Sequence, residues 1–175
     1  MYKAKMCFEQ MHKDHPYVLD GMDMYACSIF SENDNNSLGR LIYRLLEISD
    51  KRPESWNSVG MYCSLKGELE KAEKYLRHAI ELNPTRVYSH ILLGTLLTRT
   101  MDLNGAEMAF LQACSIDKTS LMAMRGLVNV YVTVPETKRG HALRVAKQAL
   151  KVFPKSAQAH ELMGRALLLF KDNSS

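Results

Sequence analysis

The sequence contains none of the short motifs on which most enzymes depend. It has no glycine-rich phosphate-binding loop and no Gly-x-Ser-x-Gly elbow. His12 and His15 form an HxxH pattern, but no further His, Cys or carboxylate follows at a spacing typical of metal sites. We interpret Asp14 and His15, which precede Pro16, as the end of a helix. The sequence therefore predicts a protein that is not an enzyme and that uses no cofactor or metal.

Long apolar runs and clustered cysteines are also missing. No apolar run approaches the roughly 20 residues that a membrane helix needs, and the charges at Lys3, Lys5 and Glu9 argue against a signal peptide. Thiols without CxxC spacing are typical of small buried residues in a reducing compartment. We therefore expect no membrane contact and a location in nucleus and cytoplasm. The cysteines are Cys7, Cys27, Cys63 and Cys114.

An excess of charge of one sign is likewise absent, because the net charge is only +4. One basic row does occur at helical spacing, and it consists of Arg144, Lys147, Lys151 and Lys155. We interpret it as the solvated outer face of a helix. A nucleic-acid stripe is the alternative, but the row lacks interleaved aromatic residues. An acidic neighbour in a larger assembly is a better functional interpretation, and no nucleic-acid partner is expected.

What the sequence does contain is a recurrence at a period of 34 residues. Small residues stand one period apart at Gly60 and Gly94, at Ala72 and Ala106, and at Ala79 and Ala113. Small residues at fixed offsets let neighbouring helices approach closely. The recurrence therefore predicts an all-α fold of stacked antiparallel helix pairs, an α-solenoid.

The fullest copy of this pattern occupies residues 53–86. Its order is Trp56, Val59 and Gly60, then Ala72, Leu76 and Ala79, and finally Pro84. This order resembles the tetratricopeptide repeat, which implies a superhelix of antiparallel helix pairs. Outside this copy, the repeat-defining positions further along the chain are Ala142, Ala149 and Gly164.

Applied to the whole chain, the frame gives a single array over residues 1–170 and a polar tail at 171–175. Whole repeats are predicted at 19–52, 53–86, 87–120 and 121–156, between a second half at 1–18 and a first half at 157–170. The frame slips by two residues within 134–140, which we interpret as a lengthened turn at Pro135. Neither end resembles the polar cap of a solenoid. We therefore expect a piece of a longer array, in which self-association would use the apolar helix at 157–170.

First helices of such repeats line the inner, concave surface, and this predicts a groove. We expect exposed groove positions at Asn57, Met61, Tyr88, Thr95, Arg125, Asn129, Glu161 and Arg165. Arg125 and Asn129 match one element of the clamp with which some tetratricopeptide domains hold the acidic C-terminus of a chaperone. The next repeat, however, has Gln158 and Leu162 where further basic and amide groups are expected, and Asp23 and Asn57 of the preceding repeats give only half of the pattern. The clamp is therefore disfavoured, and an adaptor for an acidic C-terminal chaperone peptide is kept as the alternative function.

A longer string sharpens the resemblance. Residues 16–25, PYVLDGMDMY, resemble the start of the repeat array in subunits of the anaphase-promoting complex. The Gly21-Met22-Asp23 version is most similar to the subunit 7 family, whereas residues 64–67 and 83–84 look as much like the sister subunit 8. The similarity runs from about Tyr2 to Phe170. It implies a non-catalytic scaffold segment of a cell-cycle ubiquitin ligase, whose partners are other tetratricopeptide subunits.

Overall fold

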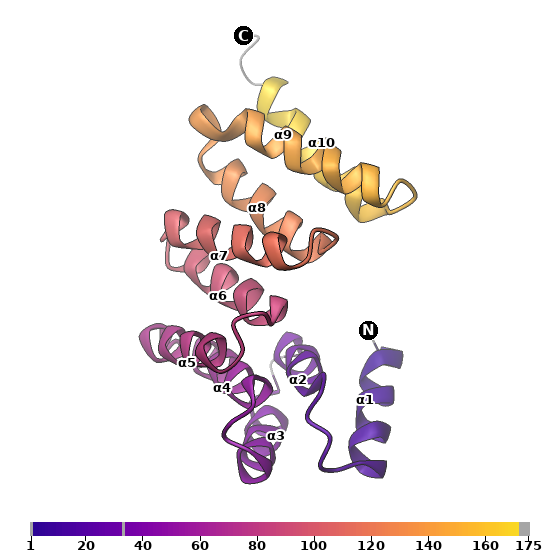
Figure 1. The fold of residues 1–175 in the computed structure, drawn as a ribbon, viewed down its shortest axis with the longest axis vertical. Coiled ribbons are helices and arrows are strands. Elements are labelled where there is room, and N and C mark those ends of the chain that lie inside the picture. Colours follow the sequence, from indigo (N-terminus) through magenta and orange to yellow (C-terminus); the bar gives the residue numbers. More distant parts are fainter. Residues whose placement is uncertain (1, 33, 172–175) are drawn as a thin grey trace. The chain divides into compact units, whose positions relative to one another are not determined.

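The computed structural model describes residues 2–32 and 34–171, and every regular element in these ranges is an α-helix (Figure 1). The helices are α1 (Tyr2–Asp14), α2 (Met22–Ser31), α3 (Asn35–Ile48), α4 (Pro53–Leu65), α5 (Leu69–Leu82), α6 (Val87–Arg99), α7 (Leu103–Ile116), α8 (Leu121–Thr133), α9 (Pro135–Val152) and α10 (Ala157–Lys171). Among these helices none combines the length and apolar character needed to cross a membrane.

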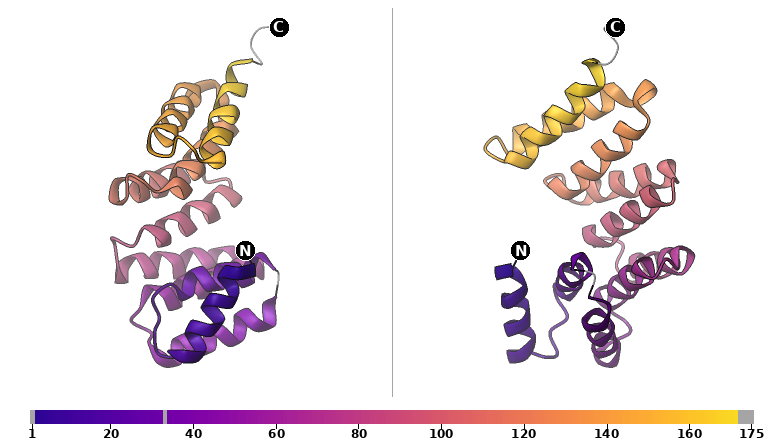
Figure 2. Two further views of the ribbon diagram at one scale, coloured as in Figure 1. Left: turned by 90° about the vertical axis from the view of Figure 1, so that its right-hand side faces the viewer. Right: turned by 180° about the vertical axis from the view of Figure 1, so that it is seen from behind.

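The chain divides into two compact units, residues 1–92 and 93–175, with the division inside α6. In the first unit α2 packs with α3, α4 packs with α5, and α1 packs on α2. In the second unit α7 packs with α8, α8 with α9, and α9 lies beside α10 (Figure 2). Within each unit, therefore, neighbouring helices stack as the solenoid architecture requires. The single continuous array stays a prediction.

Close approach of helices in the first unit depends on Gly60. A Cβ added to Gly60 would lie 2.7 Å from Cγ of Leu76 and 3.3 Å from the carbonyl oxygen of Ala72. Both partners belong to α5, and the side chains of Ala72 and Ala79 are fully buried. The small residues of the sequence pattern thus stand where α4 and α5 meet.

In the second unit Phe110 of α7 faces a first-helix glycine, as Leu76 does in the first unit. A Cβ added to Gly94 would lie 2.9 Å from the Phe110 ring, and one added to Gly126 of α8 would lie 2.2 Å from it. The ring therefore occupies space that two first helices leave open by lacking a side chain. Gly126 lies outside the 34-residue frame, so the sequence pattern did not reveal its role.

The frame slip within 134–140 has a different structural outcome from the predicted one. We expected a lengthened turn at Pro135, but only Val134 separates α8 from α9. The helix that follows has 18 residues, compared with 14 in each of α3, α5 and α7. Proline is tolerated in the first turn of a helix because its missing N–H has no intrahelical partner there. The lengthened turn was wrong, because the helix itself takes up the added length.

The last helix is less uniformly covered than the others. Ala159, Ala166 and Leu162 are buried against the rest of the second unit, whereas Leu168 is 59% exposed. A Cβ added to Gly164 would meet nothing within 4 Å, in contrast to Gly60 and Gly94. The first-helix contact surface of α10 is therefore open within the described part of the chain.

Candidate protein-binding surface

Two residues of the predicted groove are buried. Asn57 is fully buried and Met61 is 5% exposed, although both lie on the first helix α4 as expected. Tyr88, at the start of α6, is half-buried. The expected exposure of both residues was wrong, because polar and charged groups of the same unit cover Asn57, whereas Met61 packs into the apolar core of that unit.

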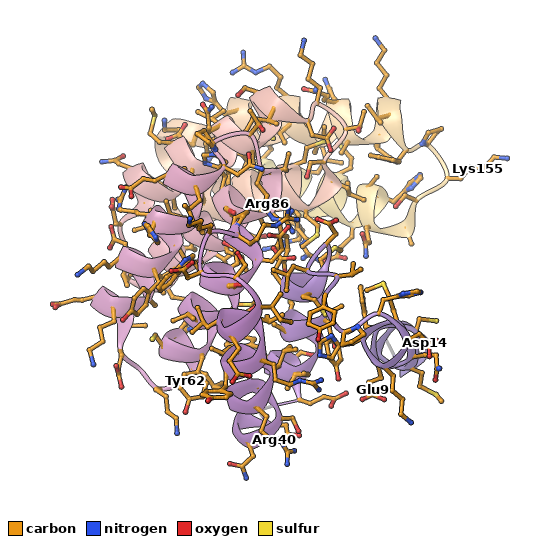
Figure 3. All side chains as sticks on the ribbon, turned by 60° about the horizontal axis from the view of Figure 1, so that its bottom comes forward. Glu9, Asp14, Arg40, Tyr62, Arg86 and Lys155 are labelled. Atoms are coloured by element: carbon orange, nitrogen blue, oxygen red, sulfur yellow. The ribbon has the colours of Figure 1, made fainter. Side chains whose placement is uncertain are left out.

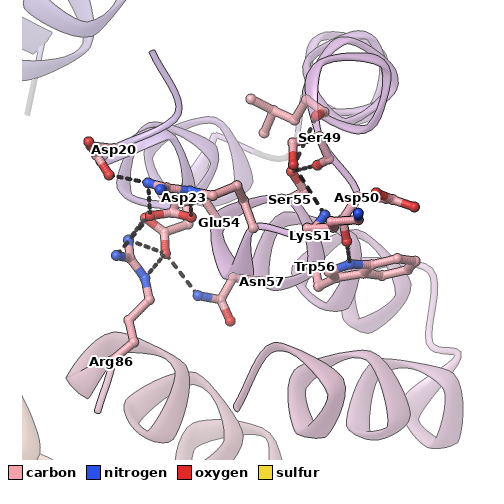
Figure 4. A network of polar contacts seen from close by, with 12 residues as sticks. Asp20, Asp23, Ser49, Asp50, Lys51, Glu54, Ser55, Trp56, Asn57 and Arg86 are labelled. Atoms are coloured by element: carbon pink, nitrogen blue, oxygen red, sulfur yellow. Dashed lines mark hydrogen bonds and ion pairs between the residues drawn. The ribbon is translucent and has the colours of Figure 1, made fainter. Parts of the chain in front are cut away.

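The covering groups centre on the carboxylate of Asp23, which is fully buried in α2 (Figure 4). Arg86 reaches it from the start of α6, with Nη2 at 2.8 Å from each carboxylate oxygen and Nε at 3.1 Å from Oδ2. Asn57 Nδ2 donates to the same Oδ2 at 2.8 Å and to Ser89 Oγ at 3.0 Å. The Asp23 backbone neighbour, the amide of Met24, donates to Oδ1 at 3.0 Å. Three successive first helices are thereby joined through one carboxylate.

A second carboxylate extends this network to the surface. Glu54 is 1% exposed, and its Oε1 lies 3.0 Å from Arg86 Nη1. Its Oε2 lies 3.3 Å from Nε of Arg52, which also pairs with Asp20. The Glu54 carboxylate is the main cause that raises the pKa of Arg52 above its ordinary value. We call Asp23, Glu54, Asn57, Arg86 and Ser89 the Asp23 cluster.

The Asp23 cluster closes the inner face of the first unit. Buried charges are tolerated when they are paired and hydrogen-bonded, and Asp23 and Glu54 meet both conditions. Sequence reasoning noticed Asp23 and Asn57 one period apart but took them as part of an incomplete clamp. The missing signal was Arg86, which stands 63 residues from Asp23 and is not one of the small or apolar positions that define the repeat pattern.

Tyr88 borders the same region. Burial is the largest cause that raises the pKa of its hydroxyl, and the nearby thiol of Cys27 adds to the shift. A half-buried phenol that stays protonated can donate a hydrogen bond but carries no charge. Tyr88 therefore contributes shape rather than charge to this surface.

The groove residues of the second unit present a different picture. Arg125 on α8 and Glu161 on α10 are exposed, whereas Asn129 and Arg165 are half-buried. The Oδ1 atom of Asn129 is buried and has no hydrogen-bond partner in the described part of the chain. Each pair lies four residues apart and so shares one face of its own helix, and the two helices pack against each other; we call these four side chains the α8–α10 face. Thr95 of α6 is exposed in the same unit.

The basic row on α9 lies open to solvent, as the sequence predicted. Arg144, Lys147 and Lys151 are exposed, and Lys155 extends outward from the loop before α10 (Figure 3). A cavity of about 350 Å³ lies beside the row, between α7, α8 and α9. Its lining includes Arg144 together with apolar side chains, so this outer face combines positive charge with apolar surface.

The cysteines occupy varied environments. Cys63 is buried, Cys27 and Cys114 are half-buried, and Cys7 is exposed. The expected burial of Cys7 was wrong, because α1 packs on α2 with its other face. Burial raises the pKa of the Cys114 thiol to about 11. No group of three or more His, Cys, Asp or Glu side chains that could hold a metal occurs among the described residues.

Comparisons with known proteins agree with the repeat architecture. The tetratricopeptide repeat family profile matches residues 53–86, the copy that carries the fullest pattern. A solved structure of a thermophilic TPR protein from Thermus thermophilus aligns with a TM-score of 0.78 and 20% identity, covering 94% of this chain and 89% of that one. At this identity the likeness shows the fold alone.

Curated relatives come from the anaphase-promoting complex. Anaphase-promoting complex subunit 7 of Arabidopsis thaliana is 29% identical over 93% of this chain, and the human subunit 7 is 26% identical over 92%. Subunit 8 of Arabidopsis thaliana is 32% identical over 53% of the chain. The chain spans 28% of the length of both subunit 7 relatives. The chain thus carries a match to the tetratricopeptide repeat at residues 53–86, shares the fold of a solved TPR protein and is similar in sequence to anaphase-promoting complex subunit 7.

Proposed function

We propose that this chain is a non-catalytic scaffold segment of the anaphase-promoting complex, a ubiquitin ligase, and that it contacts other tetratricopeptide subunits in nucleus and cytoplasm. The observation that carries the proposal is the similarity to subunit 7 over 93% of the chain. The relatives that match over shorter stretches include subunit 8 and cell division cycle protein 27 homologues, which supports a role within the same complex.

The α8–α10 face is the part of the predicted groove best suited to a partner. Arg125 has no hydrogen bond or ion pair within the described part of the chain, and Glu161 is exposed on the neighbouring helix. Unpaired exposed charges of both signs favour a partner surface of complementary mixed charge. The inner face of the first unit suits this role less, because the Asp23 cluster already satisfies its charges.

An adaptor for an acidic chaperone tail is the second candidate. The exposed guanidinium of Arg125 beside Asn129 favours it, because both groups donate hydrogen bonds to a carboxylate. Glu161 on the adjacent helix opposes it, since a second carboxylate would repel the tail. The scaffold function is therefore the better supported of the two.

The test is a pull-down from mitotic cell extract with the full chain as bait, read by mass spectrometry. Recovery of anaphase-promoting complex subunits is expected, and Arg125→Glu should reduce it. Lys74→Glu is the matched control, because Lys74 is an exposed cation on α5 of the first unit. Recovery of chaperones through their C-terminal tails, lost in Arg125→Glu, would replace the scaffold proposal with the adaptor.

A further inference from the structure

A buried histidine of α1 has both ring nitrogens unpaired. The side chain of His12 is 8% exposed, and neither Nδ1 nor Nε2 has a hydrogen-bond partner in the described part of the chain. An unpaired buried polar group is unfavourable, so a buried imidazole normally finds an acceptor or a donor. We therefore looked for a hydrogen-bond partner of the His12 ring outside the protein itself.

Two adjoining cavities border this ring. One of about 300 Å³ lies between α1 and α2, and another of about 250 Å³ extends toward α3. Both are lined by His12, Tyr25 and Arg44. We call this combined space the His12 pocket. It is large enough to hold a small polar group together with several waters, since a water molecule takes up roughly 30 Å³ in the liquid.

Positive charge predominates around the His12 pocket. Lys13 of α1 and Arg40 and Arg44 of α3 line it, against the single carboxylate of Glu9. Glu9 and Arg40 are seen on α1 and α3 in Figure 3. Three cations beside one carboxylate create a site that attracts an anion.

The charged groups differ in how far they are already engaged. Glu9 accepts a hydrogen bond from the hydroxyl of Tyr25 at 3.4 Å, and Arg40 Nη2 donates to Ser37 Oγ at 3.1 Å. Arg44 is exposed and makes no hydrogen bond or ion pair to the residues that the structure describes. Burial lowers the pKa of the His12 imidazole, and the positive charge of Arg44 lowers it further. The guanidinium of Arg44 is therefore free to receive a ligand beside the ring.

We propose that the His12 pocket binds an oxyanion, a phosphate or carboxylate group carried by a peptide, with His12 donating a hydrogen bond to it and Arg44 neutralising its charge. Guanidinium and imidazole N–H groups are both effective donors to such oxygens. The ligand would pair one of the two ring nitrogens of His12 and the guanidinium of Arg44 together. The site lies wholly within the first unit and does not depend on the α8–α10 face or on the proposed scaffold function.

The primary test follows the His12 ring by long-range ¹H–¹⁵N NMR of the full chain. Three probes are titrated separately: inorganic phosphate, a short phosphoserine peptide and a glutamate-rich peptide without phosphate. A saturable shift of the His12 ring signals is expected, with a higher pKa in the bound state because the anion offsets the charges of Lys13, Arg40 and Arg44. Glu9 and Tyr25 also face the ring, so their substitution by Gln and Phe shows how far they contribute.

The probes distinguish the source of the anion. A response to the phosphoserine peptide alone identifies phosphate, and a response to the glutamate-rich peptide alone identifies carboxylate. A response to inorganic phosphate without either peptide would overturn the peptide as carrier. An unchanged His12 ring with all three probes would overturn the site.

Two variants make the test independent of folding. Arg44→Gln should weaken binding about tenfold by removing a charged donor, and the exposed position of Arg44 keeps the fold intact. His12→Gln should weaken it similarly, and far-UV circular dichroism checks its helix content. The matched controls are His15→Gln, an exposed histidine three residues away, and Lys74→Gln. Equal affinity of Arg44→Gln and the parent chain would refute the proposal.

Discussion

Replacing Arg86 by methionine should destabilise the first unit by removing the cation that two buried carboxylates share. Methionine retains the length and apolar part of the arginine side chain, so the change removes charge and hydrogen bonds with little loss of volume. Asp23 would keep only the amide donors of Asn57 and Met24, while Glu54 would keep Arg52.

The expected loss is about 3 kcal/mol of unfolding free energy. Removing one partner of a buried ion pair typically costs about 3–5 kcal/mol, because the remaining charge stays buried and uncompensated. The lower end applies here, because the Arg86 side chain is 22% exposed and Glu54 has a second cation. Damage should concentrate in the helices of the first unit, since stability in repeat proteins is close to a sum of neighbouring terms.

Urea unfolding followed by circular dichroism measures this loss, and hydrogen exchange locates it. Arg77→Met is the control, because Arg77 forms an exposed pair with Glu73 on α5 and such helix pairs contribute about 0.3–0.5 kcal/mol. A double-mutant cycle with Asp23→Asn isolates the coupling between Arg86 and Asp23. If Arg86→Met cost no more than Arg77→Met, the inner face of the first unit would not be held by the Asp23 cluster.

Three further predictions concern packing, thiol reactivity and pH. Gly94→Leu should cost about 1–3 kcal/mol by overpacking against an aromatic ring 2.9 Å from the new Cβ, whereas Gly140→Leu, with open space around it, should not destabilise in the same urea assay. Iodoacetamide at pH 8 should modify the exposed Cys7 well before the half-buried Cys114. The Cys114 thiol has a pKa of about 11, so roughly one molecule in a thousand carries the reactive thiolate at this pH. Equal modification rates by mass spectrometry would contradict the assigned burial. Burial and then Arg44 lower the pKa of His12, so the unfolded chain binds a proton at this imidazole more readily than the folded chain does. The free energy of unfolding should therefore be unaffected by His12 above about pH 6.5 and should fall as the pH drops below that value. In His12→Gln this part of the pH dependence should vanish.

The helices were predictable because their pattern is local and repeated. Gly60, Ala72 and Ala79 recur at one period, and at Gly60 and Gly94 the small residue marks a place where another helix passes close by. The greater length of α9 was not predictable from the frame, because an insertion of two residues fits a turn or a helix equally well. Only the tolerance of proline in a first helical turn separates these outcomes, and it permits the longer helix.

The candidate surface was harder to predict, because exposure depends on side chains that the repeat does not fix. The frame placed Asn57 on a first helix, which it is, but could not show that Arg86 and Asp23 cover it. Likewise the HxxH spacing of His12 and His15 was examined and rejected as a metal site, but the sequence did not reveal the three cations near His12 that suit an anion. Contacts between residues far apart in sequence decide both cases, and the repeat-defining positions do not specify them.

Arg86 and Arg125 therefore offer a direct comparison between a structural and a binding arginine. Arg86 is engaged with two buried carboxylates, so its loss should change stability first and partner recovery only as far as the first unit unfolds. Arg125 has no such engagement. Arg125→Glu should therefore change partner recovery, while the unfolding free energy measured in urea changes by no more than a typical surface substitution, about 0.5 kcal/mol. If both variants lost stability equally, the α8–α10 face would be a structural surface like the Asp23 cluster. If neither variant altered recovery while the parent chain still captured the complex, partner contacts would lie outside the inner faces, and the exposed basic row of α9 beside its apolar cavity would become the surface to test.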